Sequence, residues 1–236
     1  MEELISGKIR MQWSSTHFRP STDSMVLADF AECHTNEKVC DLGCGCGTLM
    51  LLLAGKQDTA EIWGIEYLPE PAQFAQKNVE ANGFSSRMHV ISGDLRDASL
   101  LKAGSFDCVV SNPPYYPLAS GIVSQRDPLA DARSEKNCTL FELCACASRI
   151  VRFGGRFYLV HKPERLCDVL CALRENKLEP KRLQFVRHNE KTSRSLVLIE
   201  ARRGANGGLK VSDDLILFRQ DGTPSDDWRR IYHQEA

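Results

Sequence analysis

The stretch VCDLGCGCGTLMLLLAGK, residues 39–56, decides the fold. A short apolar run that includes Asp41 is followed by Gly43, Gly45 and Gly47 and then by a helical pattern. Glycine lets the backbone turn sharply and lets a ligand lie against the chain without interference from Cβ atoms. A strand, a glycine-rich turn and a helix in this order predict a unit of a parallel sheet, with a ligand at the carboxyl end of the strand. The spacing differs from the G-x-G-x-x-G of a dinucleotide site, and tight turns use glycine in any case, so the loop alone is weak evidence for a ligand.

Short β-rich runs alternate with helical patterns along the rest of the chain. Strands are predicted at residues 39–42, 61–65, 89–92, 106–111, 156–160, 183–188 and 195–201, and helices at residues 22–31, 48–56, 69–82, 139–152 and 163–175. Helices between successive strands predict an α/β fold, in which a parallel sheet is covered on both faces. Only Asn189 and a short polar stretch, residues 190–194, lie between the last two strands. Because a parallel connection needs a longer crossover, this pair is predicted to be an antiparallel hairpin.

The overall composition is that of an ordinary globular protein. The chain has 236 residues, of which 42% are hydrophobic and 26% charged, and its formal net charge is −1. We expect a single domain in which residues 1–37 form an extension with one helix, residues 38–203 the core and residues 204–236 a C-terminal decoration. The longest near-apolar run, residues 48–54, is far shorter than the roughly 20 residues of a membrane helix. No signal peptide is predicted, so we expect a cytoplasmic protein without membrane contact.

Ten cysteines are a high number for this length. Because no secretory signal accompanies them, a disulfide framework is not expected. The pairs Cys44/Cys46 and Cys144/Cys146 are spaced C-x-C, without the C-x-x-C and His-x-x-x-His spacing that is typical of zinc sites. Most of the cysteines are therefore predicted to be small buried hydrophobic residues, and no metal site is predicted.

Glu66 follows the second predicted strand, 19 residues after Gly47. An acid about 20 residues beyond a glycine loop is placed to accept hydrogen bonds from both hydroxyls of a ribose. A solvated acid at a strand end is the alternative, but the register with the glycine loop favours the ribose role.

The third predicted strand runs into Gly93-Asp94-Leu95. The Asp94 carboxylate, beside this short loop, could accept a hydrogen bond from the amino group of an adenine. An ordinary Gly-Asp turn explains the same residues almost as well.

The most specific motif is SNPPYY, residues 111–116, directly after the fourth predicted strand. Proline lacks an N–H and restricts the residue before it to an extended conformation, so the run offers acceptors and few donors. The Asn112 side-chain oxygen and the Pro113 carbonyl can both accept from one planar –NH2, and Tyr115 offers a flat face to a base or an amide. These three residues are predicted to be catalytic on a weakly nucleophilic exocyclic amine or amide. A Pro-rich surface turn is the alternative, which the position at the carboxyl end of the sheet disfavours.

In chain order, the glycine loop, Glu66, Asp94 and the NPPY run resemble the four motifs of class I S-adenosylmethionine-dependent methyltransferases, over about residues 38–201. The last motif resembles the subset that methylates amino groups. The resemblance implies a Rossmann-like sheet of seven strands, mostly parallel with an antiparallel last strand, and S-adenosyl-L-methionine as the cofactor. It implies that the ribose lies on Glu66 and the adenine near Asp94 and Leu95. The cofactor-binding residues that it implies are Asp41, Gly43, Gly45, Gly47, Glu66, Asp94 and Leu95.

Three further stretches carry a narrower resemblance. HFRPSTDS at residues 17–24, ARSE at residues 132–135 and RSLVLIE at residues 194–200 resemble the bacterial tRNA (adenine-N6)-methyltransferases that modify a valine tRNA beside the anticodon. The resemblance implies a tRNA substrate and adenine N6 as the methyl acceptor. The family commonly reads Ala-Arg-His-Glu where this chain has Ser134, a departure that bears on target identity if this position touches RNA.

A basic stretch follows the last predicted helix. Residues 177–210 contain nine Lys/Arg against three Glu. They could track a phosphate backbone, and a solvated edge hairpin protected by charge is an equally good alternative. The cations expected near RNA are Lys181, Arg182, Arg187, Arg126 and Arg133.

Three alternative functions stay open. A release-factor glutamine N5-methyltransferase shares the Asn-Pro-Pro-Tyr motif, but that family carries an extra helical domain before its glycine loop, and here only 38 residues precede Val39. A guanine-N2 rRNA methyltransferase is the second. An RNA-binding module without activity is the third, which the intact NPPY run disfavours. No obligate protein partner is expected, and the oligomeric state is left open.

Overall fold

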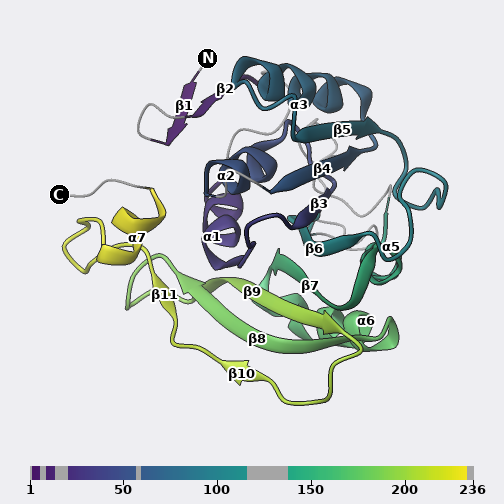
Figure 1. Cartoon of the computed structure of the whole chain (residues 1–236). Helices are drawn as coiled ribbons and strands as arrows, with labels where there is room; N and C mark the ends of the chain where they lie inside the picture. The colour runs from purple at the N-terminus through teal and green to yellow at the C-terminus, as the bar shows by residue number, and fades with distance from the viewer. Residues whose placement is uncertain (1, 6–8, 14–20, 57–59, 116–137, 233–236) are drawn as a thin grey trace, which may run out of the picture.

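The computed structural model describes residues 2–5, 9–13, 21–56, 60–115 and 138–232 (Figure 1). Its centre is one sheet with the strand order β10-β8-β9-β7-β6-β3-β4-β5, and β11 also pairs with β8. The strands are β3 (Lys38–Leu42), β4 (Glu61–Glu66), β5 (Met88–Ser92), β6 (Phe106–Ser111), β7 (Val151–His161), β8 (Leu178–Arg187), β9 (Arg194–Arg203), β10 (Lys210–Val211) and β11 (Leu215–Ile216).

The strand directions follow the sequence prediction. Strands β5, β4, β3, β6 and β7 are parallel neighbours, whereas β9 runs antiparallel to both β7 and β8. The mostly parallel sheet with an antiparallel last core strand is therefore confirmed. Short strands β10 and β11 extend the edge parallel to β8. The apolar run at residues 215–218 favours a strand where β11 lies, whereas β10 is not predicted from the sequence, because its two exposed residues carry no periodicity.

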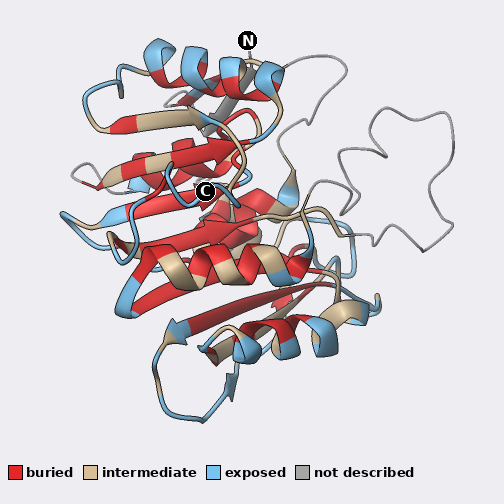
Figure 2. Cartoon of the chain, turned by 90° about the vertical axis from the view of Figure 1, so that its right-hand side faces the viewer, coloured by how far each residue is buried: buried red, intermediate tan, exposed pale blue. Residues whose placement is uncertain are grey.

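Helices cover both faces of the sheet. They are α1 (Thr22–Phe30), α2 (Thr48–Lys56), α3 (Pro69–Ala81), α5 (Leu140–Ile150), α6 (Leu166–Glu175) and α7 (Asp226–Ile231). One buried cluster joins α1, α2 and α3 to the sheet, and a second joins α5 and α6. Tyr158 belongs to the first cluster and its neighbours Phe157 and Leu159 to the second, because successive side chains of a strand point to opposite faces. Figure 2 shows the outcome: the central strands are buried, and the helices expose their outer faces.

Strand β7 begins five residues earlier than the sequence predicts. Gly154 and Gly155 read in the sequence as the end of a helix, but they form an irregularity inside β7, where the pairing with β6 changes register. Gly154 has a φ of +75°, and a Cβ on Gly155 would lie 2.8 Å from the carbonyl oxygen of Asp107. Glycine is therefore needed at both positions to keep the two strands paired. The predicted helix at residues 163–175 is also divided, into a 3₁₀ turn, η1 (Pro163–Arg165), and α6.

Both ends of the chain pack near α1 and α2. Strands β1 (Glu2–Ile5) and β2 (Ile9–Met11) form a hairpin, and β2 lies against α2 and α3 (Figure 1). Helix α7 lies beside α1, where Arg230 Nη1 is 2.5 Å from both carboxylate oxygens of Asp29. The segment after β9 thus returns to the start of the chain.

All ten cysteines are free, and seven of them are buried. Burial raises the pKa of the thiols of Cys40 and Cys44 well above the ordinary value. Both behave as small hydrophobic residues, as the sequence analysis predicts for most of the set. No helix in the described ranges is long and apolar enough to cross a bilayer.

Candidate active site

The predicted site residues lie at or just after the carboxyl ends of β5, β4, β3 and β6, which are neighbours in the sheet. The N–H groups of Gly43 and Cys44 donate to the carbonyl of Ile65 at 2.9 and 3.1 Å, which holds the loop after β3 against the end of β4. Ser111 Oγ donates to the carbonyl of Leu42 at 2.7 Å, which ties the end of β6 to the end of β3. Parallel strands therefore bring the separate motifs to one edge of the sheet.

The glycine loop, residues 43–47, presents an open backbone. Gly43, Gly45 and Gly47 have φ values of +76°, +54° and +86°, a region that side chains with a Cβ rarely adopt. Within the described part of the chain, a Cβ on Gly43 or Gly45 would meet no atom within 4 Å, whereas one on Gly47 would lie 3.3 Å from Ala75 Cβ. The first two glycines therefore leave space beside the loop, and the third allows α3 to pack closely.

Glu66 is fixed by backbone donors of this loop and of the turn after β4. Its Oε2 accepts from the N–H of Gly45 at 2.9 Å and its Oε1 accepts from the N–H of Leu68 at 2.8 Å, and the residue is only 9% exposed. Each carboxylate oxygen can accept more than one hydrogen bond, so this geometry leaves acceptor capacity. The structure thus places Glu66 beside the glycine loop, and its ribose role stays a prediction.

Asp41 is a buried acid without a full set of partners. It is 2% exposed, and its Oδ2 has no hydrogen-bond partner among the described residues. Burial, and next the negative charge of Glu66, raise the pKa of Asp41 from 3.8 to about 8. A carboxyl group in this state favours a ligand that brings a positive charge or a donor.

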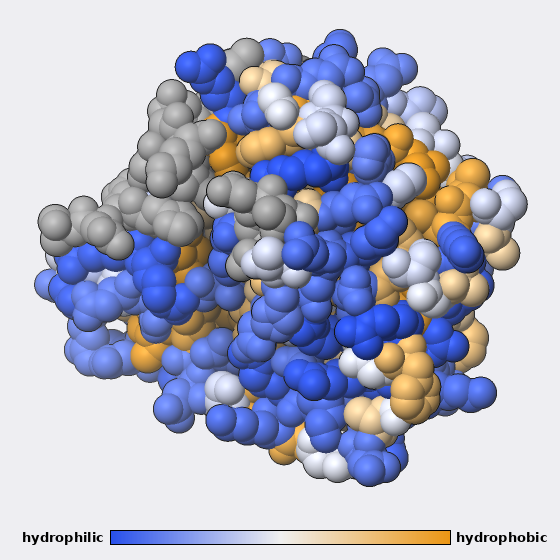
Figure 3. Space-filling model, viewed as in Figure 1, coloured by the Kyte–Doolittle hydropathy of each residue, from blue (hydrophilic) through white to orange (hydrophobic). Residues whose placement is uncertain are grey.

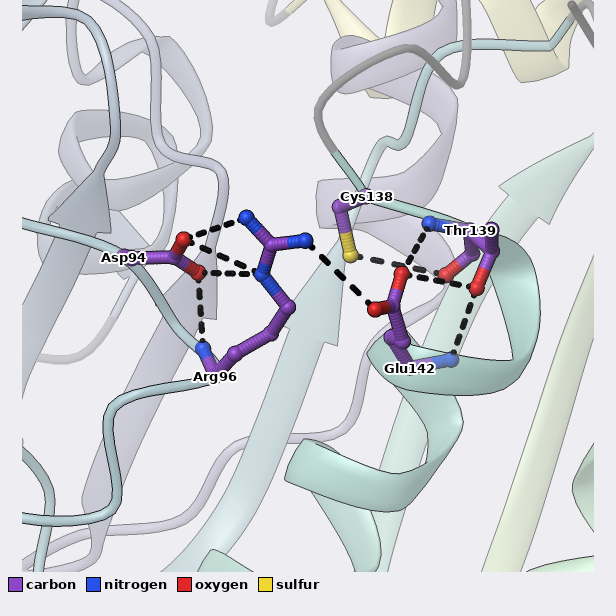
Figure 4. A network of polar contacts seen from close by, with 5 residues as sticks. All are labelled: Asp94, Arg96, Cys138, Thr139 and Glu142. Atoms are coloured by element: carbon purple, nitrogen blue, oxygen red, sulfur yellow. Dashed lines mark hydrogen bonds and ion pairs between the residues drawn. The ribbon is translucent and has the colours of Figure 1, made fainter.

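Asp94 has a partner that the sequence analysis did not consider (Figure 4). Arg96 Nε lies 2.9 and 3.0 Å from the two carboxylate oxygens, and Arg96 Nη2 lies 2.5 Å from Oδ2. Hydrogen bonds from Arg96 hold the pKa of Asp94 below its ordinary value. Arg96 Nη1 also reaches Glu142 at 3.5 Å, in the first turn of α5. Leu95 is half-buried against the cluster of α5 and α6. The adenine role of Asp94 and Leu95 stays a prediction.

The acceptor turn, residues 112–115, is held by the first turn of α1. Asn112 Nδ2 donates to Ser24 Oγ at 3.1 Å. The Tyr115 hydroxyl lies 2.5 Å from Asp23 Oδ2 and 2.8 Å from Asn112 Oδ1. The sequence analysis placed Asn112 and Tyr115 together, but it named Asp23 and Ser24 only as part of the HFRPSTDS stretch and predicted no contact between them and the acceptor turn. The available signal was the polar start of a helix that is otherwise apolar and buried.

The turn after β7 supplies two further contacts to Tyr115. Lys162 Nζ lies over the Tyr115 ring, 5.0 Å from its centroid, and Arg165 Nη1 donates to the Tyr115 carbonyl at 3.2 Å. A base that stacks on Tyr115 therefore shares the ring with the Lys162 ammonium or displaces it. The sequence analysis predicted the stacking face but missed this cation, which lies 47 residues further along the chain.

His161 packs beside the same ring, with the two ring centroids 5.3 Å apart. It is fully buried, and its Nδ1 accepts from the N–H of Lys162 at 2.8 Å. Burial, and next the charge of Arg165, lower the pKa of His161 to about 4. The ring is therefore neutral near pH 7 and carries its proton on Nε2, for which the described residues offer no acceptor.

The cations of the basic stretch are largely used within the fold. Hydrophilic side chains cover the face over β8 and β9 (Figure 3). Arg182, however, stacks on Phe30 at 4.0 Å and pairs with Glu32 and Glu200. Arg187 donates to the carbonyl of Thr192 at 2.8 Å and lies 3.7 Å from Asp214, and Lys181 donates to the carbonyl of Asn206 at 3.0 Å. These contacts favour the edge-hairpin alternative, and the RNA role of the stretch stays a prediction.

Several predicted positions lie outside the described residues. They are residues 17–20 of the HFRPSTDS stretch, Tyr116, Arg126, Arg133 and Ser134.

Comparisons with known proteins agree on one family. Residues 33–195 match the family described as "Methyltransferase domain". The tRNA1(Val) (adenine(37)-N6)-methyltransferase of Porphyromonas gingivalis is 31% identical over 196 residues, which are 81% of this chain and 76% of the relative. The enzyme of the same name from Yersinia enterocolitica is 32% identical over 142 residues, 59% of this chain and 55% of the relative.

Solved structures show the same fold. A protein from Agrobacterium tumefaciens, described as a predicted O-methyltransferase, superposes with a TM-score of 0.74 at 21% identity, covering 90% of this chain and 96% of that one. A geranyl diphosphate methyltransferase, in complex with its substrate and sinefungin, has a TM-score of 0.57 at 16% identity, covering 76% of each chain. At these identities the likeness is one of architecture alone.

Proposed function

The chain belongs to the S-adenosylmethionine-dependent methyltransferases, and we propose that it methylates the exocyclic N6 amine of an adenine in tRNA. The observation that carries this proposal is the acceptor turn, because Asn112 and Tyr115 lie at the end of β6, which Ser111 ties to the end of β3 beside the glycine loop. The matched relatives are named for adenine 37 of tRNA1(Val), so that nucleotide is the first target to test.

The residues around the glycine loop fit S-adenosylmethionine. A cofactor can lie against Gly43 and Gly45 because no atom of the described residues occupies the space that their Cβ atoms would fill. We place the ribose hydroxyls at Glu66, which is already oriented by two backbone donors. Asp41 Oδ2, which is buried and has no hydrogen-bond partner in the described ranges, suits the positively charged end of the cofactor. Gly47 shapes the loop, and Asp94 and Leu95 would border the adenine.

The proposed chemistry depends on two acceptors of the chain. S-adenosylmethionine supplies a methyl group on a sulfonium, so the donor needs no further activation. An adenine amine shares its lone pair with the ring and is a poor nucleophile. Asn112 Oδ1 and the Pro113 carbonyl accept hydrogen bonds from its N–H groups, which become more acidic as the nitrogen turns tetrahedral, so the two acceptors bind the transition state better than the ground state. The methylated amine then loses its extra proton to water. Tyr115 replaces the stacking that the base loses when it leaves its neighbours.

The charge beside Tyr115 favours a nucleotide over a glutamine side chain. Lys162 has no carboxylate partner in the part of the chain that the structure describes, and its ammonium lies 5.0 Å from the Tyr115 ring centroid. A nucleotide brings a phosphate that such a cation can bind, and a neutral glutamine does not. This contrast supports RNA over a release factor as the substrate.

The test is methyl transfer from labelled S-adenosylmethionine to candidate acceptors. Purified protein is incubated separately with tRNA1(Val) transcript, rRNA and release factor, and digests are analysed for N6-methyladenosine by mass spectrometry. We expect label in the tRNA, and its loss when adenine 37 is replaced by guanine. Label in rRNA or in a glutamine would instead identify one of the alternative functions.

A further inference from the structure

The first turn of α1 contacts both side chains of the acceptor turn. Ser24 is 7% exposed, and its Oγ accepts from Asn112 Nδ2, 88 residues away in the sequence. Asp23 Oδ2 lies 2.5 Å from the Tyr115 hydroxyl, 92 residues away. None of the sequence motifs for the cofactor or the amine includes these two contacts.

The Tyr115 hydroxyl has one proton and two acceptors. Asp23 Oδ2 is closer, at 2.5 Å, than Asn112 Oδ1, at 2.8 Å. A carboxylate is also a stronger acceptor than an amide oxygen, so the phenol proton goes preferentially to Asp23. If Asp23 were absent, the same proton would occupy Asn112 Oδ1, the atom that the target amine needs.

We propose that Asp23 and Ser24 are positioning residues of the methyl-transfer site. Asp23 takes the phenol proton of Tyr115, which leaves Asn112 Oδ1 available to the amine and fixes the plane of the ring. Ser24 holds Asn112 Nδ2 at the helix, so that Oδ1 points towards Tyr115. The inference rests on the proposed function, because it assigns Asn112 Oδ1 to an amine substrate.

Helix α1 is held firmly enough to act as a support. Ser21 caps its N-terminus by accepting from the N–H of Ser24. Near its other end, Lys56 Nζ donates to the backbone carbonyls of Ala28 and Asp29 at 2.6 and 3.2 Å. Because both ends are anchored, Asp23 and Ser24 are presented at a constant distance from the acceptor turn.

Single-turnover methylation of a responsive tRNA tests the proposal. We expect Asp23→Ala to lower the rate about 10–100-fold, the scale of one charge-assisted hydrogen bond. The rate of Asp23→Asn should fall between those of the parent and Asp23→Ala, because its amide oxygen can still accept the phenol proton but is no stronger an acceptor than Asn112 Oδ1. Ser24→Thr keeps the hydroxyl and should be faster than Ser24→Ala. Asp29→Ala is the matched control on the same helix; it removes the contact with Arg230 and should leave the rate unchanged.

A double-variant comparison separates positioning from general damage to α1. In a Tyr115→Phe background there is no phenol proton to compete for Asn112 Oδ1, so Asp23→Ala should cost little further rate. An equal loss in both backgrounds, or a parent rate for Asp23→Ala, would overturn the proposal.

A second measurement needs neither RNA nor cofactor. Protein labelled with 3-fluorotyrosine is examined by ¹⁹F NMR, with the Tyr115 resonance assigned through Tyr115→Phe. We expect this resonance to move in Asp23→Ala and to stay in place in Asp29→Ala. If the parent protein methylates no RNA, the proposed function fails, whereas an unmoved resonance in Asp23→Ala rejects the contact itself. Asp23→Asn, with its smaller expected shift, serves if Asp23→Ala does not fold.

Discussion

The glycine loop and the acceptor turn lie at the ends of neighbouring strands, yet they are held in different ways. The glycine loop is shaped by backbone conformation and anchored by Glu66, which lies 21 residues from Gly45 and one strand along. The acceptor turn is anchored by Asp23 and Ser24, 92 and 88 residues away and on a helix outside the βα repeat. The geometry of the glycine loop thus depends on residues that are near in the chain, whereas the geometry of the acceptor turn depends on how α1 packs against it.

The largest expected effect is on the acceptor side. Asn112→Ala removes the side-chain oxygen that would bind the amine, so we expect turnover to fall about 10²–10³-fold, the scale for losing one positioned transition-state hydrogen bond. Cofactor affinity should change little, since Asn112 contacts Ser24 and Tyr115 rather than the glycine loop. Single-turnover kinetics and a calorimetric titration measure the two quantities. An unchanged rate would mean that Asn112 is not the amine acceptor.

On the cofactor side, Glu66→Ala should weaken S-adenosylmethionine binding about 10–100-fold, the range expected for lost hydrogen bonds to a charged acceptor. The variant also leaves the N–H groups of Gly45 and Leu68 without their acceptor, so the loop itself should loosen. Glu61→Ala is a suitable control, because Glu61 lies at the other end of β4 and pairs with Lys38 at 3.0 Å. Isothermal calorimetry gives the S-adenosylmethionine affinity of each variant. If Glu66→Ala binds the cofactor as tightly as Glu61→Ala, Glu66 does not belong to the cofactor site.

A smaller effect is expected at the cation beside Tyr115. Lys162→Met should raise the KM for tRNA about 3–10-fold and reduce the slope of log affinity against log salt by about one, as for the loss of one phosphate contact. Lys102→Met is the control, because Lys102 is exposed and precedes β6 at the opposite edge of the sheet. Binding titrations at several salt concentrations provide the slope. A slope that matches the parent would argue against a phosphate at Lys162.

The smallest effect concerns one proton at Asp41. Its pKa of about 8 in the folded protein lies above the ordinary 3.8, so the folded state holds a proton that the unfolded chain releases. The contribution of Asp41 to the free energy of unfolding therefore falls as the pH rises between about 4 and 8. A positively charged cofactor should lower this pKa and release about one proton on binding at pH 7.

Calorimetry of cofactor binding in buffers with different ionisation enthalpies counts that proton. Asp41→Asn should abolish the release and flatten the fall in stability between pH 5 and 8, measured by denaturant unfolding. Proton release that persists in the variant would assign it to another group.

Much of the core architecture is predictable from residue order. The alternation of β-rich and helical stretches predicts the parallel strands, and the short gap after β8 predicts its antiparallel pairing with β9. The errors lie where local signals are ambiguous: Gly154 and Gly155 look like a helix end but form an irregularity in β7, which depends on pairing with β6.

Sequence alone located the glycine loop, the acid at the end of the second predicted strand and the NPPY run after the fourth, because backbone preference and strand order depend on residues near in the chain. Tertiary structure alone decided what surrounds those groups. Arg96 pairs with the Asp94 carboxylate, the Lys162 ammonium lies over the Tyr115 ring, and Asp23 competes with Asn112 for the Tyr115 hydroxyl proton. The physical reason is that a hydrogen bond or a charge contact between residues 47 to 92 positions apart forms only once helices have packed on the sheet. The identity of a side chain does not predict which distant residue it will contact. Arg96 differs in that it lies only two residues from Asp94. The turn after β5 brings these two side chains together.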